Sequence, residues 1–492
     1  MGQQDLRTFV ARLEAAGQLV RVRAEVSTNL EIAEIAGRLV AADGPAALFE
    51  NVAGHTMPVL VGALASMERM AWALGFRDLQ SATARVAEIA DLSRVFDDPN
   101  GGIGAAGKLA TLPLLAKLFR FVPKTVPHGP SQEVVLRGEA DLQRLPVLKS
   151  WPGDGGPTIT LPQVYTTDPD GKKRNCGMYR LQIFGPRRLG LHWHHDHDGA
   201  RNFRAWAERG KAMPVAIALG GDPVLTYAAT APLPYGVDEL IFAGFLRGQA
   251  VDVVSCRTVP LTVPACAEIV IEGIADPKER AREGPFGDHT GYYSAPDDYP
   301  VLKVTAITHR RDAIYPTTVV GRFPKEDLYL AKTTERLFLP LVQARVPQVV
   351  DLNLPPFGAF HNWAFVSIRK TEPGDARRVM DALWATGQMK YTKFLAVVDA
   401  DVNVHDLQEV LWRIGTEVDP KRDTLVTTGP ADVLDHAAPQ DGRQEGGKIG
   451  LDATRKLPDE VGGQVWPEPL RPDGETARRV TERWAEYGFG ST

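Results

Sequence analysis

Apolar and polar positions recur with a helical period in some parts of the chain and with a strand period in others. Near the N-terminus, four apolar residues share one helical face: Leu6, Phe9, Val10 and Leu13. Residues 18–26 then alternate apolar and polar side chains, as a half-buried strand does. Residues 28–42 predict a second amphipathic helix, and Thr28 or Asn29 is suited to cap it. This alternation predicts an N-terminal α/β domain over residues 1–124.

Strand-like runs bounded by Gly and Pro dominate residues 125–325, where helical patterns are few. The runs read YRLQIFG, MPVAIALG, VDVVSCRTV, AEIVIEGIA, VLKVTAITHR and AIYPTTVVG. Many short strands in one block are typical of a β-barrel or a sandwich. The α/β alternation returns over residues 326–455, although the polar, Gly-rich residues 439–450 predict a mobile loop. Residues 456–492 predict an amphipathic terminal helix. Taken together, the α/β ends and the strand-rich centre predict a multidomain protein of the α+β class.

The composition is that of an ordinary globular protein, with 44% hydrophobic and 24% charged residues. A net charge of −5 gives no sign of a nucleic-acid partner. The three cysteines, Cys176, Cys256 and Cys266, form no CxxC pair, which favours a reducing compartment. The sequence has neither a signal-peptide core nor an apolar run of about 18 residues. We therefore expect a cytoplasmic protein without a transmembrane segment.

The segment GIGAAG, residues 102–107, matches the dinucleotide-binding pattern GxGxxG. That site requires a strand directly before the glycines, because the pyrophosphate binds where the strand becomes a helix. Here the preceding DDPNG is typical of a turn. A loop before the helical pattern KLATLPLLAKLF is the better interpretation, and we expect no dinucleotide site here.

Four histidines lie within six positions of the segment LGLHWHHDHDGA: His192, His194, His195 and His197. If the segment continues a strand, the first two share one face and the last two share the other. At most two or three of them then converge on one ion. The cluster is compatible with a zinc hydrolase, with a plain surface cluster, or with a polar wall beside a bound cofactor in which one histidine contacts a metal.

Two acids and an arginine favour the cofactor wall. Glu283 and Asp288 flank a Gly-Pro-Phe-Gly turn that can bring both carboxylates to one site. Two close carboxylates push their proton affinities apart, and an arginine such as Arg180 keeps one of them ionised. Asn175 offers a hard oxygen ligand, which suits Mn²⁺ or Mg²⁺ better than zinc. The alternative is a surface ion pair beside a turn.

These motifs occur together with several others in a specific order. They read NCGMYRLQ, VAIALGGDP, ELIFAGFLRG, VPACAEIVIEG, EGPFGDHTGYY, YTKFLAVVDADVNV and KIGLDAT. The set resembles the UbiD-like decarboxylases, which use prenylated FMN, and is most similar to the bacterial 3-polyprenyl-4-hydroxybenzoate carboxy-lyases. The resemblance covers nearly the whole chain. It implies an N-terminal α/β domain (1–124), a central flavin-binding split β-barrel (125–325), a C-terminal α/β domain (326–455) and a helical tail used in oligomerisation (456–492).

The resemblance also implies roles for individual residues. The family's catalytic triad falls on Arg180, Glu283 and Asp288, with Asp288 as proton donor. The metal that binds the cofactor phosphate, Mn²⁺ or Mg²⁺, falls on Asn175, His197 and Glu239, and a K⁺ site falls on the carbonyls of Ala229 and Ala231. The implied cofactor contacts are Asn175, Met178, Tyr179, Arg180, His192, Trp193, His194, His197, Asp198 and Glu239. Residues 314–327 are expected to line the substrate pocket, chiefly through Thr318, Val320 and Arg322. Arg322 is suited to bind a second carboxylate or a polar ring substituent, or to form a structural salt bridge.

The implied reaction is the reversible, non-oxidative decarboxylation of an aromatic, heteroaromatic or α,β-unsaturated carboxylic acid, with CO₂ as the second product. Prenylated FMN acts as the electron sink and comes from a flavin prenyltransferase, and the carboxy-lyase is expected to form a homodimer or homohexamer. The alternatives are a 4-hydroxy-3-polyprenylbenzoate decarboxylase of ubiquinone biosynthesis, a split-barrel flavin oxidoreductase and a zinc hydrolase. The His-rich wall favours a small aromatic or heteroaromatic acid.

Overall fold

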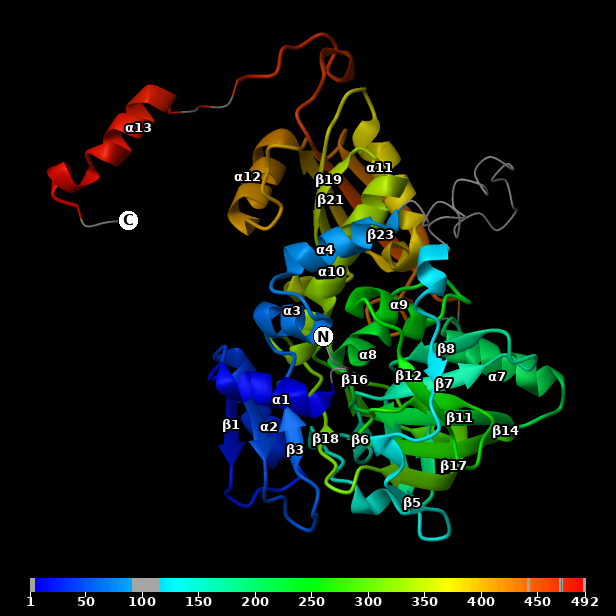
Figure 1. Cartoon of the computed structure of the whole chain (residues 1–492). Coiled ribbons are helices and arrows are strands. Elements are labelled where there is room, and N and C mark those ends of the chain that lie inside the picture. The colour runs from blue at the N-terminus through cyan, green and yellow to red at the C-terminus, as the bar shows by residue number, and fades with distance from the viewer. Residues whose placement is uncertain (1–4, 91–115, 440–442, 469, 471, 490–492) are drawn as a thin grey trace.

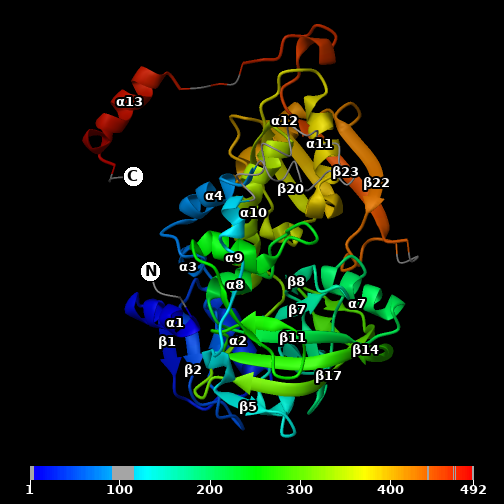
Figure 2. The same ribbon diagram turned by 45° about the vertical axis from the view of Figure 1, so that its right-hand side comes forward.

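The computed structural model describes residues 5–90, 116–439, 443–468, 470 and 472–489, so the GIGAAG segment lies outside the described residues. Figure 1 shows an N-terminal part, a central sheet beside it, a C-terminal sheet and a separate terminal helix. Helix α10 (Glu326–Arg345) lies in the middle of the molecule, between the central and the C-terminal sheets (Figures 1 and 2). The expected multidomain α+β class is confirmed.

The N-terminal part is a four-stranded sheet with helices, as the alternating pattern predicted. Its elements are α1 (Leu6–Ala15), β1 (Leu19–Val22), α2 (Glu31–Ala41), β2 (Ala46–Phe49), β3 (Val59–Val61), α3 (Met67–Leu74) and α4 (Leu79–Ala87). All four apolar residues of the predicted helical face of α1 are buried. The sheet order is β1-β2-β3-β18, and its last strand, β18 (Tyr315–Pro316), comes from the AIYPTTVVG run that we had expected in the central domain.

The predicted cap of α2 is wrong. The helix is preceded by Leu30, which has a φ of 70° and makes no side-chain capping bond. Asn29 instead forms a parallel bridge with Lys149, and the Leu30 N–H donates to the carbonyl of Lys149. This long-range pairing fixes the residues before the helix in an extended conformation, and the Glu31 carboxylate accepts from the Ser27 N–H in place of a cap.

The central part is built on a curled nine-stranded sheet. Eight strands follow the order β6-β9-β10-β17-β14-β11-β7-β8, and β5 pairs with β17. Their bounds are β5 (Val134–Leu136), β6 (Thr158–Ile159), β7 (Gln163–Thr167), β8 (Arg174–Gly177), β9 (Leu181–Gly185), β10 (Arg188–Gly190), β11 (Met213–Leu219), β14 (Ile269–Glu283) and β17 (Asp297–His309). Smaller sheets join β4 (Lys124–Thr125), β12 (Asp252–Ser255) and β13 (Thr262–Pro264), and β15 (Phe286–Gly287) with β16 (Tyr293–Ser294).

Both faces of the central sheet are covered, which explains why its strands are so apolar. Every residue of β11 is buried. Ala216 and Ala218 belong to the core that includes α1 and α9, whereas Val215 and Ile217 belong to the core on the other face. Successive strand residues point to opposite faces, so a strand with two buried faces loses its polar positions. Helices α7 (Asp198–Glu208), α8 (Pro223–Ala228) and α9 (Glu239–Arg247) accompany this sheet.

The C-terminal part is a five-stranded sheet of order β19-β20-β21-β23-β22. Its elements are β19 (Val349–Asn353), β20 (Trp363–Ile368), α11 (Asp375–Trp384), β21 (Phe394–Asp399), α12 (Leu407–Glu417), β22 (Thr424–Pro430) and β23 (Glu445–Ala453). Short 3₁₀ helices complete the chain: η2 (Pro130–Gln132), η3 (Leu142–Arg144), η4 (Pro356–Gly358), η5 (Gly387–Tyr391), η6 (Pro458–Glu460) and η7 (Trp484–Tyr487).

The loop predicted over residues 439–450 is wrong for its described second half. Strand β23 pairs with β21 on one side and β22 on the other. The segment looked like a loop because its inward positions are glycines and a lysine. Lys448 is buried, and its ammonium donates to the carbonyls of Lys390 and Thr392. Gly450 is small because Met380 of α11 packs directly over it.

The predicted terminal helix is present as α13 (Gly474–Glu482), and it stands away from the rest of the molecule (Figures 1 and 2). None of its residues is buried. Within the described part of the chain, none of the helices combines the length and the apolar character that crossing a bilayer requires.

We predict that Gly450→Ala destabilises the protein by about 1–3 kcal/mol, the usual cost of adding volume to a packed core. A β-carbon at Gly450 would lie 2.5 Å from the Met380 sulfur and 3.2 Å from the Trp384 ring. The control on the same strand is Gly447→Ala, whose β-carbon has nothing within 4 Å. Urea unfolding should separate the two variants, and equal midpoints would contradict the packing argument.

Candidate active site

A cavity of about 280 Å³ lies where the central sheet, α10 and the C-terminal part meet. Most of its wall comes from residues 160–320 of the central part, and Phe360 and Leu434 close it from the C-terminal part. The full lining is Thr160, Met178, Tyr179, Arg180, His192, His194, His197, Phe286, Asp288, His289, Val320, Asp327, Phe360 and Leu434. The cavity therefore combines acids, an arginine, histidines and apolar side chains in one small space.

Arg180 holds both predicted catalytic carboxylates. Its Nε and Nη2 donate to the two oxygens of Glu283 at 2.9 and 3.2 Å, and its Nη1 donates to Asp288 Oδ2 at 2.5 Å. Nη2 also donates to Ser294 at 2.9 Å, and the guanidinium lies over the Phe286 ring at 4.3 Å. An arginine has five N–H groups, so these four bonds leave one N–H of Nη1 for a ligand.

The ion pairs keep both acids charged. Burial alone would raise the pKa of Glu283, but hydrogen bonds from His192 and Arg180 lower it to about 2. Burial would also raise the pKa of Asp288, but His289 and Arg180 hold it well below its usual range. The backbone N–H and the Nδ1 of His289 both contact Asp288 Oδ1, at 2.8 and 2.9 Å. The contact raises the pKa of His289, although burial opposes this.

The strand interpretation of the histidine cluster is wrong. Strand β10 ends at Gly190, and the chain turns at residues 195–196 before α7 begins at Asp198. The turn is closed by a hydrogen bond from the His194 N–H to His197 Nδ1 at 3.1 Å. His192, His194 and His197 therefore converge on the cavity wall instead of alternating between faces. His195 stays at the surface beside Asp196.

The three convergent histidines form a neutral, hydrogen-bonded stack. His192 Nδ1 must carry a proton because it contacts the ionised Glu283 at 3.0 Å, so its Nε2 accepts from His194 Nε2 at 2.7 Å. Burial lowers the pKa of all three rings, to about 2 for His194 and about 4 for His197. The His194 and His197 rings stack at 4.7 Å, and Tyr179 lies 4.9 Å beyond.

Six of the expected cofactor contacts line the cavity: Met178, Tyr179, Arg180, His192, His194 and His197. Trp193 does not, because its ring packs in the core against Tyr179 and Phe203. Asp198 begins α7 behind Tyr179, whose hydroxyl accepts from the Gly199 N–H at 3.4 Å.

The expected metal ligands lie close to one another, behind Tyr179. The Asn175 amide contacts the Tyr179 hydroxyl at 3.4 Å, and the His197 ring stacks on the same tyrosine. Glu239 begins α9, and one of its oxygens accepts from the Cys176 N–H at 2.8 Å. Burial raises the pKa of Glu239, and with the charges of Asp238 and Asp198 and the opposing backbone hydrogen bonds the value is about 8. No group of three or more His, Cys, Asp or Glu side chains within the described ranges is arranged as a metal centre.

The remaining expected residues differ in their positions. Val320 lines the cavity, and the Thr318 carbonyl accepts from the cavity residue Thr160 at 2.6 Å. Arg322 is exposed and is not part of the lining. The carbonyls expected to bind K⁺ each accept an N–H already: Ala229 from Met178, and Ala231 from Leu233, both at 2.8 Å.

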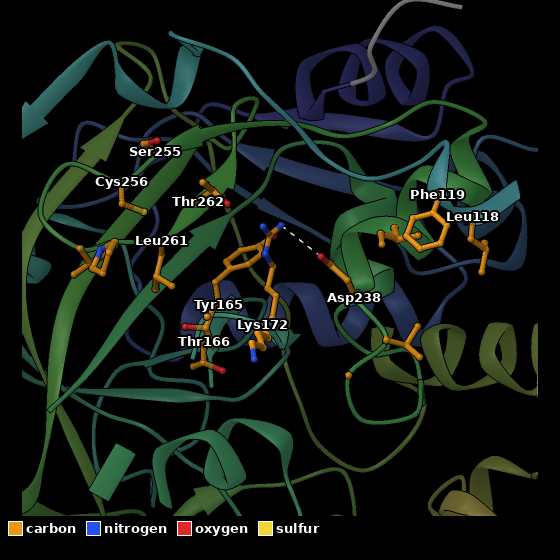
Figure 3. A pocket seen from close by; sticks show the side chains of 18 residues that line it. Leu118, Phe119, Tyr165, Thr166, Lys172, Asp238, Ser255, Cys256, Leu261 and Thr262 are labelled. Atoms are coloured by element: carbon orange, nitrogen blue, oxygen red, sulfur yellow. Dashed lines mark ion pairs between the residues drawn. The ribbon is translucent and has the colours of Figure 1, made fainter. Parts of the chain in front are cut away.

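A larger cavity of about 760 Å³ lies elsewhere on the central part (Figure 3). Arg174 and Asp238 meet in it at 3.6 Å, and Lys172, Ser255 and Thr262 contribute polar groups. Arg174 and Asn175 are consecutive on β8 and so point to opposite faces of the strand. This second cavity is therefore separate from the site around Asn175, and it contains none of the predicted catalytic residues.

Sequence reasoning assigned no role to two titratable residues of this cavity, His289 and Asp327, although Asp327 ends the 314–327 segment expected at the pocket. His289 follows Asp288 in the GDHTG motif, so its position next to the proposed acid was visible. Asp327 had no such signal, because an acid in the first turn of a helix is ordinary.

Family models match three consecutive parts of the chain. They describe the N-terminal, Rift-related and C-terminal domains of 3-octaprenyl-4-hydroxybenzoate carboxy-lyase, over residues 10–92, 124–323 and 328–453. The chain belongs to the UbiD family of carboxy-lyases. An uncharacterised protein of Archaeoglobus fulgidus is 45% identical over 489 residues, which is 99% of each chain.

Solved structures of UbiD-class enzymes share the fold. HmfF of Pelotomaculum thermopropionicum, in complex with FMN, is 31% identical, with a TM-score of 0.78 over 95% of this chain and 98% of that chain. The closed form of the vanillic acid decarboxylase of Sedimentibacter hydroxybenzoicus is 28% identical, with a TM-score of 0.84 over the whole of both chains. Its open form gives 0.78 over 99% of this chain and all of that one. HmfF binds FMN, and an evolved dimeric form of it binds prenylated FMN, while the Sedimentibacter relative is a decarboxylase.

We predict that Glu283→Gln lowers the free energy of unfolding by about 3–5 kcal/mol at pH 7, because it removes one partner of a buried ion pair. The pKa of Glu283 is lowered from 4.5 to about 2, so its contribution is complete above pH 4.5 and is lost as the pH falls towards 2. Urea unfolding should show a gap to wild type that is smaller at pH 4 than at pH 7.

The control for this change is Glu279→Gln on the same strand. Glu279 pairs with Lys303 and Arg188 at the surface, where removal of an ion pair costs about 0–1 kcal/mol. Equal losses for the two variants would contradict a structural role for the buried triad.

Proposed function

We propose that this enzyme decarboxylates a small aromatic or heteroaromatic acid at the cavity around Arg180, with prenylated FMN as cofactor. The observation that carries the proposal is the buried Arg180–Glu283–Asp288 arrangement at a cavity wall. A guanidinium with one N–H free can hold a substrate carboxylate, and two acids beside it can hold and move a proton. The flavin would take up the side of the cavity lined by Tyr179 and the histidines, so the part of the roughly 280 Å³ left beside Arg180 favours a small substrate over one with a polyprenyl chain.

The residues present fit a flavin with a metal-bound phosphate. The neutral stack of His194, His197 and Tyr179 offers a flat, uncharged wall to a planar ring. Glu239 is a buried carboxylate beside two further acids, and a divalent cation would relieve their repulsion. The amide oxygen of Asn175 and the carboxylate of Glu239 are hard ligands that suit Mn²⁺ or Mg²⁺. If His197 binds the metal through Nε2, its Nδ1 must carry the ring proton. Nδ1 could then no longer accept the hydrogen bond from the His194 N–H.

Prenylated FMN, when bound, supplies the electron sink that loss of CO₂ from an unsaturated carbon requires. The protein's own part is to orient and to move a proton. Arg180 holds the substrate carboxylate with its remaining N–H, and Glu283 keeps Arg180 in place through two hydrogen bonds. Phe286 packs against the guanidinium and keeps water from it. After CO₂ leaves, Asp288 delivers a proton to the carbon that carried it.

The proton comes from the Asp288–His289 pair rather than from Asp288 alone. The pKa of Asp288 is lowered and that of His289 is raised, so at neutral pH the pair keeps its proton on the imidazole. His289 Nδ1 is 2.9 Å from Asp288 Oδ1 and can return a proton to it during each turnover. His289 is thus a positioning residue that supplies the acid.

The similarity to the closed form of the vanillic acid decarboxylase supports a closed state here. Asp196 of the histidine turn accepts hydrogen bonds from Tyr391 at 2.8 Å and Lys390 at 3.2 Å in the C-terminal part. We propose that these contacts fasten the C-terminal part over the cavity. We also retain the proposals of a K⁺ site near Ala229 and Ala231, a flavin prenyltransferase as cofactor source, and oligomerisation through α13.

The decisive experiment is to produce the chain together with a flavin prenyltransferase and purify it without oxygen. We expect the released cofactor to have the mass of prenylated FMN, and hydroxybenzoates and heteroaromatic acids to yield CO₂. Chain produced without the prenyltransferase is the control and should release no CO₂. Stoichiometric zinc without flavin, or NAD(P)H oxidation without CO₂ release, would refute the proposal in favour of a hydrolase or an oxidoreductase.

We predict that Asp288→Asn retains the flavin but lowers kcat by about 10²–10⁴-fold, the usual contribution of a positioned acid. The asparagine keeps the size of the side chain and loses the proton. The flavin absorption spectrum checks cofactor binding, and CO₂ release checks turnover. Wild-type kcat in this variant would remove Asp288 from the mechanism.

We predict that His289→Gln moves the alkaline limb of the kcat–pH profile to lower pH. In the wild type the pair keeps its proton up to the raised pKa of His289 and loses activity above it. Without the imidazole, the proton must reside on Asp288 itself, which Arg180 keeps acidic. An unchanged limb would assign the profile to another group. His195→Gln, at the exposed end of the cluster, is the control.

A further inference from the structure

Asp327 is an acid of the cavity around Arg180 whose carboxylate makes no contact that stabilises the described part of the fold. It lies in the first turn of α10 and belongs to the cavity lining. Both of its carboxylate oxygens are shielded from solvent, and among the described residues neither has a hydrogen-bond partner. Burial raises the pKa of Asp327 to about 7, although the charge of His289 opposes this. Burying a carboxylate that accepts no hydrogen bond costs free energy. Because Asp327 faces the cavity, a bound ligand can supply the missing donor.

The neighbouring acid shows what a structural role looks like here. Glu326 is buried at the same helix end, and its Oε1 accepts from the Leu64 N–H at 2.6 Å. That bond joins α10 to the N-terminal part. Glu326 therefore stabilises the contact between α10 and the N-terminal part, whereas Asp327 makes no such contact with the described residues and faces the cavity.

The charges around the cavity decide which ligand group Asp327 can meet. Among the described residues that line it, Arg180 is the only Arg or Lys, and four of its five N–H groups are already taken. The reacting carboxylate needs the fifth. Arg322, which we expected to bind a second anion, is exposed outside the lining. The His289 imidazolium is the other cation of the described lining, and its Nδ1 already contacts Asp288 Oδ1 at 2.9 Å. A second carboxylate would therefore lie beside Asp327 and Asp288 without a cation of its own.

We propose that Asp327 accepts a hydrogen bond from a hydroxyl or N–H group on the substrate, so that the preferred substrate is an aromatic monoacid carrying such a donor. The inference rests on the proposed function, because it takes Arg180 as the anchor of the reacting carboxylate. Arg180 and Asp327 line the same cavity, and Asp327 lies close enough to Asp288, the partner of Arg180, to feel its charge. One ring bound beside the flavin wall can therefore contact both residues. Above its raised pKa of about 7, Asp327 carries the same negative charge as Asp288, and the two together select against dicarboxylates.

The test compares three groups of ligands: the monohydroxybenzoates, benzoate and the benzenedicarboxylates. Dissociation constants are measured by calorimetry on the flavin-free protein, where no turnover occurs, and kcat/KM is measured on the flavin-loaded protein. The best hydroxybenzoate should bind about 10- to 100-fold more tightly than benzoate, the range that one hydrogen bond to a charged group supplies. The dicarboxylates should bind most weakly.

The matched variant is Asp327→Asn, which keeps the shape and removes the charge, with its melting temperature as the check of folding. It should lose most of the hydroxybenzoate preference and bind dicarboxylates more tightly than the wild type does. Asp381→Asn, an exposed acid on α11, should retain the wild-type ranking.

Equal affinity for all three groups in the wild type, no binding of any of them, or an unchanged ranking in Asp327→Asn would overturn the inference. A hydroxybenzoate preference that depends on Asp327, without CO₂ release from the flavin-loaded enzyme, would uphold it while refuting the proposed reaction.

Discussion

The proposed active site is organised by one buried guanidinium that must balance two buried carboxylates. Arg180 contacts Glu283 at 2.9 Å and Asp288 at 2.5 Å, and neither acid is accessible enough for water to replace it. Removing one partner from such a group leaves a buried charge without compensation, which is far more costly than losing a surface ion pair. The long strand β14 ends at Glu283, and the turn after it returns Asp288 to the same arginine. The ion pairs thus fix the end of the central sheet and the shape of the cavity together.

The histidine cluster depends on this arrangement. Because Glu283 is ionised, His192 must direct its Nδ1–H towards it. The Nε2 of His192 is then an acceptor, so the Nε2 of His194 must carry the proton of the hydrogen bond between the two rings. The stack stays neutral because burial and mutual repulsion lower the pKa of each ring. A site with one charged triad and a neutral wall beside it suits chemistry in which charge moves through a planar ring.

Two acids line the cavity, Asp288 and Asp327, and two more, Glu283 and Glu326, lie close behind them in sequence or space. Asp288 and Glu283 are held by Arg180, and Glu326 is held by a backbone N–H, but Asp327 has no donor among the described residues. The first three have their hydrogen-bond partners within the protein, and we propose that the last finds its partner on the substrate. This division follows the general observation that a scaffold is satisfied internally, whereas a binding group is left for its ligand.

The sequence by itself determined the family, the α1 face, the β-rich centre and the Arg180–Glu283–Asp288 set, because periodicity and motif order are local properties of the chain. It misplaced β23, the α2 cap and the faces of the histidines. The first two depend on distant residues, Gly450 on Met380 and Asn29 on Lys149, and the histidines depend on a local turn that ends the strand at Gly190. Only the tertiary structure showed which of residues 314–327 line the cavity, because the wall that takes in Asp327 and leaves Arg322 outside is closed by Phe360 and Leu434, far along the chain.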